Sequence, residues 1–402
     1  MRNVVKSFIN ELNNGIPQKT ADSNLLKVYK LQKNRLDEEG IEMRMKVTPS
    51  DDDSEWFNTA SWKDDHYKTD VICAYTTYNR SFYKKGENTP IYNNTGRYLF
   101  YSDVTECRDY SVAQDDPYEC PNCGSVSTLQ KISSEGCSHC GAHFSMSELY
   151  PKVSCNYMVN NLGTKKQLVF DILKFVVPSM IICMILGMIN FGRSRLPVIN
   201  GLFGGLFSGA FLGYILWVGS VMWKLFSGVA KAVPKISSAK DSRKEFTSRM
   251  REISEEFSYE YFTAEAISKL KAIMYSSKDS SLSFYTGNET VEFDHIVESS
   301  FSGALGLKAF RFDGNVVTTE VLAFMENFYY IDGRIVKKDE TIQMTLMRDI
   351  SQKMDYHFNI RSVNCPSCAS SFDAYSNPIC PYCGTHVNMS KHDWIVTSCK
   401  KQ

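Results

Sequence analysis

Two long apolar stretches near the middle of the chain stand out from a mixed pattern of hydrophobic and polar positions. They run over Leu168–Ile189 and Val198–Phe226, and the charged residues of the first are Asp171 and Lys174, close to its start. A helix needs about 20 mostly apolar residues to cross a bilayer. The pattern therefore predicts a transmembrane helical hairpin over residues 168–226, with the buried hairpin of a soluble protein as the alternative.

Both stretches carry small residues at a spacing of four, which puts them on one face of each helix. In chain order they are Ser179, Cys183, Gly187, Gly205, Gly209 and Gly213. Such ridges let two helix backbones approach closely. We predict that the hairpin packs against itself. The alternatives are a pore and a seam between copies of the chain, but the sequence offers no polar lining for a conduction path.

Basic residues flank the apolar pair on its outer sides. They are Lys165, Lys166, Lys231, Lys235, Lys240, Arg243 and Lys244. The turn between the stretches contributes Arg193 and Arg195. The positive-inside rule then predicts a multi-pass protein of the cell membrane with both termini in the cytoplasm. We interpret residues 227–245 as a basic juxtamembrane linker whose five cations, from Lys231 to Lys244, attract anionic lipid or serve only to set the topology.

Outside the hairpin the pattern is that of an α+β protein. Residues 246–276 place apolar side chains at helical spacing, and β-rich segments follow at 290–297, 303–313, 316–328 and 340–354. A long helix followed by an antiparallel sheet predicts an α+β domain with a curved, cone-shaped sheet. At the N-terminus, Val4, Val5, Phe8, Ile9 and Leu12 predict a helix buried against a first sheet, with a membrane-surface helix as the alternative.

Eight of the thirteen cysteines form two CxxC…CxxC quartets. The first quartet is Cys120, Cys123, Cys137 and Cys140, and the second is Cys365, Cys368, Cys380 and Cys383. Zn²⁺ takes four tetrahedral ligands, and two tight turns with two thiolates each supply them. We therefore predict two zinc ribbons whose closed coordination makes the metal structural. Disulfides, buried thiols and iron are the alternatives. His139 and His143 are possible ligands that an intact quartet makes unnecessary.

The residues after the second cysteine of each pair support a turn in the backbone. Gly124, Gly141 and Gly384 can take a left-handed conformation that turns backbone N–H groups toward sulfur. Ala369 occupies this position in the third turn and departs mildly from the pattern.

The two halves of the chain resemble each other. The ribbons match best, and Cys155 and Cys399 trail them at similar distances. Upstream, Asp70-Val-Ile-Cys-Ala-Tyr matches Glu320-Val-Leu-Ala-Phe-Met, and the segment from Gly96 to Val104 matches the segment from Ile342 to Ile350. We predict that each half is a sheet domain that ends in a ribbon.

Composition excludes several functions. The net charge is zero, which gives no basic excess for binding nucleic acid. The sequence has no P-loop, dinucleotide fingerprint, HExxH or GxSxG motif. Asp294 and His295 are the best acid–base candidates, but neighbours on a strand point to opposite faces. We therefore expect no enzymatic activity and no catalytic residue.

The C-terminal half resembles a known family. Glu256-Phe-Ser-Tyr-Glu-Tyr-Phe262, the helix that follows and the later strands resemble the domain shared by bacterial proteins and the mitochondrial import-motor tether, subunit forty-four of the inner-membrane translocase. The resemblance covers residues 246–362. It implies a nuclear-transport-factor-like fold, membrane association and a tethering role without chemistry. The hairpin and the second ribbon depart from the mitochondrial protein and look more like bacterial membrane proteins that pair this domain with a zinc ribbon.

Together these patterns predict two cytoplasmic α+β modules, each capped by a ribbon and joined by the hairpin. The segments are an N-terminal module at 1–118, a ribbon at 119–160, the hairpin at 168–226, the linker at 227–245, the translocase-tether-like domain at 246–362 and a ribbon at 363–402. We expect a membrane scaffold that binds protein partners. The alternative is a sensor or transport accessory protein with a lipid or small apolar ligand in the C-terminal cone, which would need a large apolar pocket.

Overall fold

The computed structural model divides the chain into two compact units. One, called the main unit, comprises residues 1–160 and 239–402, and the other, the hairpin unit, comprises residues 161–238. The structure describes the chain except for residues 64–66, 108–114, 121, 143–144, 147–149, 161–164, 191–196, 255–256, 277–281, 288–292, 352–359, 362, 373, 375–376 and 392. Side chains are also left out at 107, 133–134, 145–146, 160, 165–171, 190, 197–202, 221–241 and 360–361. Arg193, Arg195 and His143 lie outside the described residues.

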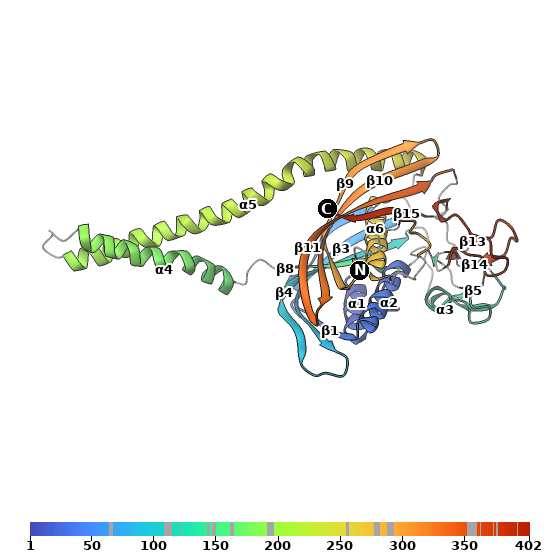
Figure 1. Ribbon diagram of the computed structural model, residues 1–402, viewed down its shortest axis with the longest axis horizontal. Helices are drawn as coiled ribbons and strands as arrows, with labels where there is room; N and C mark the ends of the chain where they lie inside the picture. Colours follow the sequence, from blue (N-terminus) through green and yellow to red (C-terminus); the bar gives the residue numbers. More distant parts are fainter. Residues whose placement is uncertain are drawn as a thin grey trace. The chain divides into compact units, whose positions relative to one another are not determined.

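The hairpin unit contains α4 (Lys165–Asn190) and the first part of α5 (Pro197–Ile253), which run side by side (Figure 1). Two windows, Ile172–Ile189 and Phe203–Ser220, are long and apolar enough to cross a membrane. Only 6% and 17% of these windows are buried. Their apolar side chains are therefore exposed, unlike those of a core hairpin in a soluble protein.

The glycine ridge of α5 lies directly against the backbone of α4. A Cβ atom added to Gly205 would lie 2.4 Å from the Cα of Met184, and one added to Gly209 would lie 2.4 Å from the Cα of Met180. At Gly213 the corresponding distance, to Val176, is 2.5 Å. These separations are far below van der Waals contact, so only glycine fits. The prediction that the hairpin packs against itself is confirmed.

The segment expected to be a linker is helical. Residues 227–245 belong to α5, which ends at Ile253. The expected single helix at 246–276 is divided in two, because α6 (Tyr259–Tyr275) starts afresh with Ser258 as its N-cap. The hydroxyl of Ser258 accepts a hydrogen bond from the N–H of Tyr261 and so satisfies one of the free donors of the first turn.

The N-terminal half of the main unit is a helix pair on an antiparallel sheet. Its elements are α1 (Arg2–Asn14), α2 (Ser23–Glu38), β1 (Ile41–Pro49), η1 (Asp53–Glu55), β2 (Trp56–Lys63), β3 (Tyr67–Lys84), β4 (Pro90–Cys107) and β8 (Lys152–Asn160). The strand order is β1-β3-β4-β8, and β2 also pairs with β3. Val5, Phe8, Ile9 and Leu12 of α1 are buried in this half's core, as predicted.

The C-terminal half repeats this arrangement. After the end of α5 and α6 come β9 (Ile296–Asp313), β10 (Val316–Ile331), β11 (Arg334–Asp349) and β15 (Ile395–Lys401), in the order β9-β10-β11-β15. Of the strand expected at 290–297, residues 290–292 lie outside the described residues and 293–295 are not in a strand. Residues 296–297 begin β9, which continues into the strand expected at 303–313. Gly303, with φ of 82°, lies where the pairing of β9 with β10 shifts register.

The two halves therefore share one topology of two helices, three strands, a cysteine-rich insert and a last strand. Cys155 pairs with Asp103, and Cys399 pairs with Met344, so the trailing cysteines occupy matching positions. Asp103 pairs with Val71 of β3, and Met344 pairs with Val321 of β10. The sequence comparison also matches Val71 with Val321. The expected match between the third strands is wrong by five residues, because it pairs Asp103 with Asp349.

The extra strand of the N-terminal half also fits the repeat. β1 pairs with residues 76–84 of β3, and β2 pairs with residues 68–74 of the same strand. Together they take the place of the single long strand β9, which pairs along the whole of β10. Asp52 caps the short helix η1 between them, and the acidic run at 51–53 is exposed to solvent.

The halves pack on a shared interior. Val28 of α2 and Cys155 of β8 belong to the same buried cluster as the residues of α6 and the C-terminal sheet. Nη1 of Arg80, on β3, donates to Oε1 of Glu298, on β9, at 2.6 Å, and both side chains are largely buried. A buried, hydrogen-bonded ion pair of this kind fixes one mutual arrangement. The two expected modules are thus parts of one compact unit.

The carboxyl group of Asp103 is buried within this unit. Its Oδ1 atom has no hydrogen-bond partner among the described residues. Burial, followed by the negative charge of Glu260, raises the pKa of Asp103 from 3.8 to about 7. Between pH 3.8 and about pH 7, the carboxyl group of Asp103 is protonated in the folded protein and ionised in the unfolded chain. The free energy of unfolding therefore falls as the pH rises through this range.

We expect Asp103→Asn to be more stable than the wild type at about pH 8, because the amide carries no charge to bury. The advantage should shrink on acidification and disappear near pH 4, since each pH unit in the interval is worth about 1.4 kcal/mol. Urea unfolding curves at several pH values measure this difference. A difference that stays constant across them would contradict the raised pKa.

Candidate metal centres

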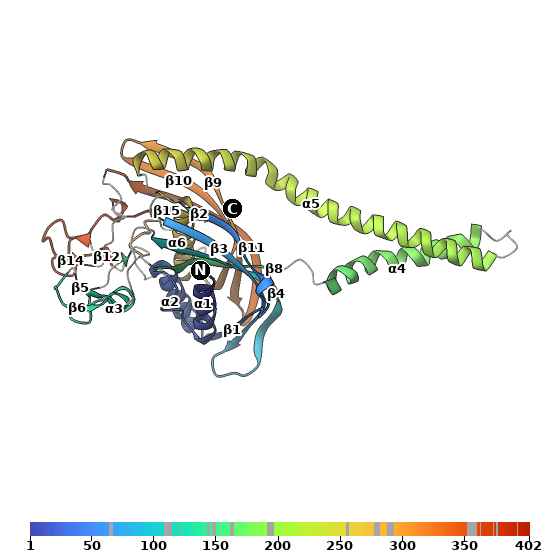
Figure 2. The ribbon, with the colours of Figure 1, turned by 180° about the vertical axis from the view of Figure 1, so that it is seen from behind.

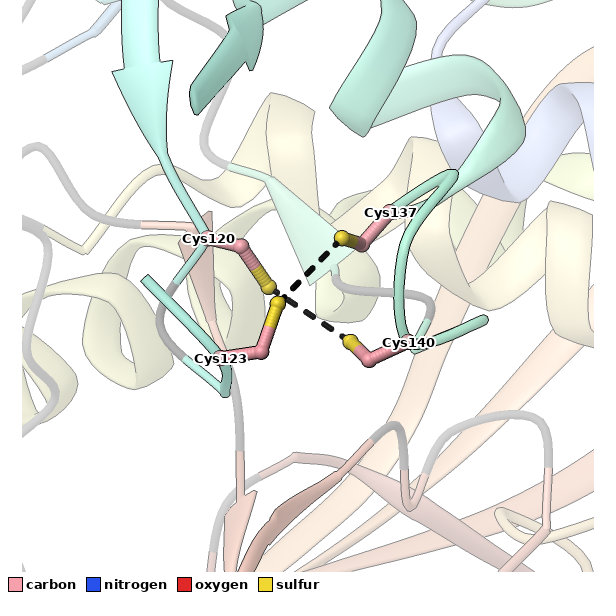
Figure 3. Close-up of side chains that lie close together, drawn as sticks. All are labelled: Cys120, Cys123, Cys137 and Cys140. Carbon is pink, nitrogen blue, oxygen red and sulfur yellow. Dashed lines mark hydrogen bonds between the residues drawn. The ribbon is translucent and has the colours of Figure 1, made fainter. Parts of the chain in front are cut away.

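The first quartet lies on two backbone turns that follow short elements. Cys120 and Cys123 come after β5 (Pro117–Glu119), and Cys137 and Cys140 come after α3 (Leu129–Glu135). β5 pairs with β6 (Val126–Thr128), and Leu129 and Ile132 of α3 pack beside the buried cysteines. Figure 3 shows the four sulfur atoms pointing toward one another from the two turns.

The second quartet repeats this arrangement. Cys365 and Cys368 lie between β13 (Val363–Asn364) and β14 (Ser371–Phe372), which pair with each other. Cys380 and Cys383 precede the short helix η3 (Met389–Lys391). A small core that includes Phe372 and Met389 packs around the buried members of this quartet.

The distances between sulfur atoms suit a tetrahedral metal site. Sγ of Cys120 lies 3.7 Å from that of Cys140, and Sγ of Cys123 lies 3.7 Å from that of Cys137. In the second quartet the cross-turn distances are 3.4 Å and 3.7 Å. An ion about 2.3 Å from four tetrahedral sulfurs would separate them by about 3.8 Å. A disulfide needs about 2.05 Å, and all eight thiols are free.

All four turns use the same pair of backbone hydrogen bonds. In the first, the N–H of Cys120 donates to the carbonyl of Ser125, and the N–H of Gly124 donates to the carbonyl of Cys120. The turn needs a left-handed residue, and Gly124, Gly141 and Gly384 have φ values of 72°, 71° and 75°. Ala369 adopts the same conformation with φ of 58°, at some cost in strain.

Each quartet mixes thiols of opposite character. The hydroxyl of Ser125 and the N–H of Cys140 lower the pKa of Cys137 to about 5, and the hydroxyl of Thr385 lowers the pKa of Cys383 to about 6. Burial instead raises the pKa of Cys120 to about 12 and that of Cys380 to about 11. Cys137 and Cys383 are therefore thiolates at neutral pH, and a bound cation would displace the protons of Cys120 and Cys380.

The structure brings together all eight predicted ligands, in two groups that can each hold one ion. His139 is exposed and is absent from both groups. Four thiolates form a soft donor set, which suits zinc or iron, and leave no open position for water.

The acid–base candidates lie in a turn. Asp294 and His295 precede β9, and they do not lie on a strand as expected. His295 has a positive φ of 66°, is well exposed, and places Nδ1 3.0 Å from Oε1 of Glu39. This pair links the end of α2 to the start of β9.

Two of the five residues expected at anionic headgroups have described side chains. Arg243 forms an ion pair with Glu260 and covers the ring of Tyr259 at 4.3 Å. Lys244 is exposed. Both line an open groove of about 940 Å³ in the main unit, between the end of α5 and Trp62 of β2. The side chains of Lys231, Lys235 and Lys240 are outside the described part.

A contact between the two ribbons could not be found from the sequence. β7 (Ser145–Met146), after the first quartet, pairs with β12 (Ile360–Arg361), before the second. Nδ2 of Asn122 also donates to the hydroxyl of Tyr382 at 2.9 Å. The ribbons lie side by side at one end of the main unit in both views (Figures 1 and 2).

The fold and the sites define an α+β protein with two four-cysteine groups and two apolar helices that are long enough to cross a membrane. No model of a protein family matches the chain, and neither does any curated protein or solved structure.

Proposed function

We propose that this protein is an integral membrane scaffold whose two zinc ribbons, on the cytoplasmic side, bind a protein partner. The main observation is that two four-cysteine groups lie side by side at one end of a compact unit. The same chain contains two exposed apolar helices. Zinc is the metal of choice because structural four-thiolate ribbons in a reducing compartment take it.

Membrane insertion is supported by the exposure of the hairpin. Phe207 is 76% exposed and Ile189 is 70% exposed, and many apolar neighbours on both helices are also exposed. So continuous an apolar surface is unfavourable in water and favourable in the hydrocarbon of a bilayer. The excess of basic residues on the outer flanks favours both termini in the cytoplasm of a cell membrane, in a multi-pass arrangement.

The interior of the C-terminal half favours partner binding over ligand binding. Helix α6 is buried along almost its whole length against the sheet, so side chains fill the place where a lipid would bind. A cavity between α2, β1, β8, α6 and β9 measures about 50 Å³. Drug-sized ligands need roughly 300–1,000 Å³. This cavity is too small for the ligand of the sensor alternative, and the groove of about 940 Å³ beside Arg243 is open to the surface and lies outside the cone.

The resemblance to the import-motor tether is part of this proposal. A helix pair on an antiparallel sheet is consistent with the nuclear-transport-factor-like cone that the resemblance implies, and it occurs in both halves, with four strands in the C-terminal sheet and five in the N-terminal one. A tether needs a rigid body near the membrane and an exposed surface for its partner. Val126 is 64% exposed, Tyr382 is 56% exposed and Ile379 is 48% exposed, all on the ribbons. We propose that they contact the partner.

The test is crosslinking in cells, followed by membrane solubilisation and mass spectrometry of the tagged full-length protein. We expect recurrent partners with the wild type that are lost with Val126→Asp/Ile379→Asp. The matched control is Ile331→Asp/Val336→Asp, which adds the same charges to exposed apolar sites on β10 and β11. Equal loss with both variants, or co-purification of a lipid without any protein, would overturn the proposal.

A further inference from the structure

The side chain of Asn122 joins the two four-cysteine sites. Asn122 lies between Cys120 and Cys123 in the first turn of the first ribbon. Its Nδ2 atom lies 3.4 Å from Sγ of Cys140, on the opposite turn of the same quartet. The same atom lies 2.9 Å from the hydroxyl of Tyr382. One amide group thus contacts a metal-ligating sulfur of the first site and the body of the second ribbon.

Tyr382 occupies the corresponding place in the second ribbon. It lies between Cys380 and Cys383, so both cysteines that flank it are ligands of the second quartet. Its side chain is well exposed, and its position therefore depends mainly on the conformation of that turn. An ion that holds Cys380 and Cys383 would fix the turn and bring the hydroxyl to Asn122.

A second contact depends on both ribbons. Ser145 and Met146 follow Cys140 closely, and they pair with Arg361 and Ile360, which precede Cys365. A two-residue ladder has little stability by itself. Each ribbon must therefore be ordered before either contact between the ribbons can form.

We propose that the two sites bind metal cooperatively, so that occupancy of one ribbon raises the affinity of the other for the same thiophilic divalent cation. The first ion orders its own ribbon, which then holds its side of each of the two contacts in place. When the second ion orders the other ribbon, both contacts form at once, and their free energy adds to the affinity of the second ion. Asn122 and Tyr382 are positioning residues in this coupling. The inference rests on the proposal that both quartets bind metal.

The experiment uses the full-length protein in solutions in which a chelator fixes the concentration of free Zn²⁺. Alkylation followed by mass spectrometry reads the protection of each cysteine peptide, so the two quartets are measured separately. The quantity compared is the free Zn²⁺ concentration that protects half of the first quartet. We expect it to rise about five-fold or more in Tyr382→Phe, because coupling between sites is typically worth at least that factor. Tyr382→Phe removes a hydroxyl whose partner in the first ribbon is Asn122 and not a cysteine.

The matched control is Ser367→Ala, at the middle position of the other turn of the second ribbon. The hydroxyl of Ser367 accepts a hydrogen bond from the hydroxyl of Thr385 within its own ribbon, so the first quartet should keep its affinity for Zn²⁺. Cys365→Ser/Cys368→Ser should weaken the first quartet at least as much as Tyr382→Phe does. An unchanged first quartet in Tyr382→Phe would overturn the coupling while leaving metal binding intact. If Zn²⁺ protects neither quartet in the wild type, the proposed metal binding fails instead.

Discussion

Cys365→Ser should remove one of two bound zinc ions and destabilise the C-terminal half by about 4 kcal/mol or more, in the range expected for loss of a metal site. The reason is that Cys365 is one of the four proposed ligands and is also buried in the small core of the second ribbon. That core includes Ile395, the first residue of β15. Loss of the ion therefore weakens the edge strand of the C-terminal sheet. Metal analysis of the purified protein and thermal unfolding measure the two effects.

Cys155→Ala is the matched control for this experiment. Cys155 is also a buried cysteine, but it lies on β8, outside both quartets. We expect it to retain both ions and to lose only the stability that a small core truncation costs, about 1 kcal/mol. Two ions retained in Cys365→Ser, together with an unchanged unfolding temperature, would rule out a metal site at the second quartet.

The quartets could be predicted because all their determinants are local. Each pair of cysteines is separated by two residues, and a glycine follows three of the four pairs and favours the left-handed turn, so the local sequence indicates the geometry. The glycine ridge could also be predicted, since residues four apart share a helix face. The close contact between Gly209 and Met180 needed only the assumption that the two helices pack together.

Features that depend on distant residues could not be predicted. The pairing of Arg80 with Glu298 joins positions 218 residues apart, and no local pattern indicates it. The same holds for the contact between Asn122 and Tyr382, 260 residues apart. These contacts make one compact unit of two similar halves. The third strands were matched wrongly because the match rested on local sequence similarity, which does not show which residues of the neighbouring strands pair with them.

The division of the helix at 246–276 has a different cause. Apolar side chains continue at helical spacing through the break, so periodicity predicts one helix. In the structure Phe257 is buried between the end of α5 and the start of α6, and its N–H donates to the carbonyl of Ser254. Ser258 then caps α6. Serine is a common N-cap, and this signal was present in the sequence but was weaker than the apolar pattern.

Gly205→Ile should disrupt the hairpin, and Gly204→Ile should leave it nearly intact. The two glycines are neighbours on α5, but a Cβ at Gly205 would lie 2.4 Å from the Cα of Met184. A Cβ at Gly204 would meet no atom within 4 Å in the described part of the chain, apart from its own chain neighbours and the backbone of its own helix. The obstacle at Gly205 is backbone, which cannot rotate away, so α4 and α5 must separate. Overpacking of this kind typically costs about 1–3 kcal/mol, and lost contacts along the ridge add to it.

The measurement is the unfolding temperature of the detergent-solubilised protein, with the two isoleucine variants compared side by side. Both variants add the same apolar side chain to the same helix, so helix propensity and hydrophobicity cancel in the comparison. We expect a clear loss of stability at Gly205 and a temperature close to that of the wild type at Gly204. Equal behaviour of the two would mean that α5 does not pack on α4 through its glycine ridge, and the ridge would then be free to face a second copy of the chain.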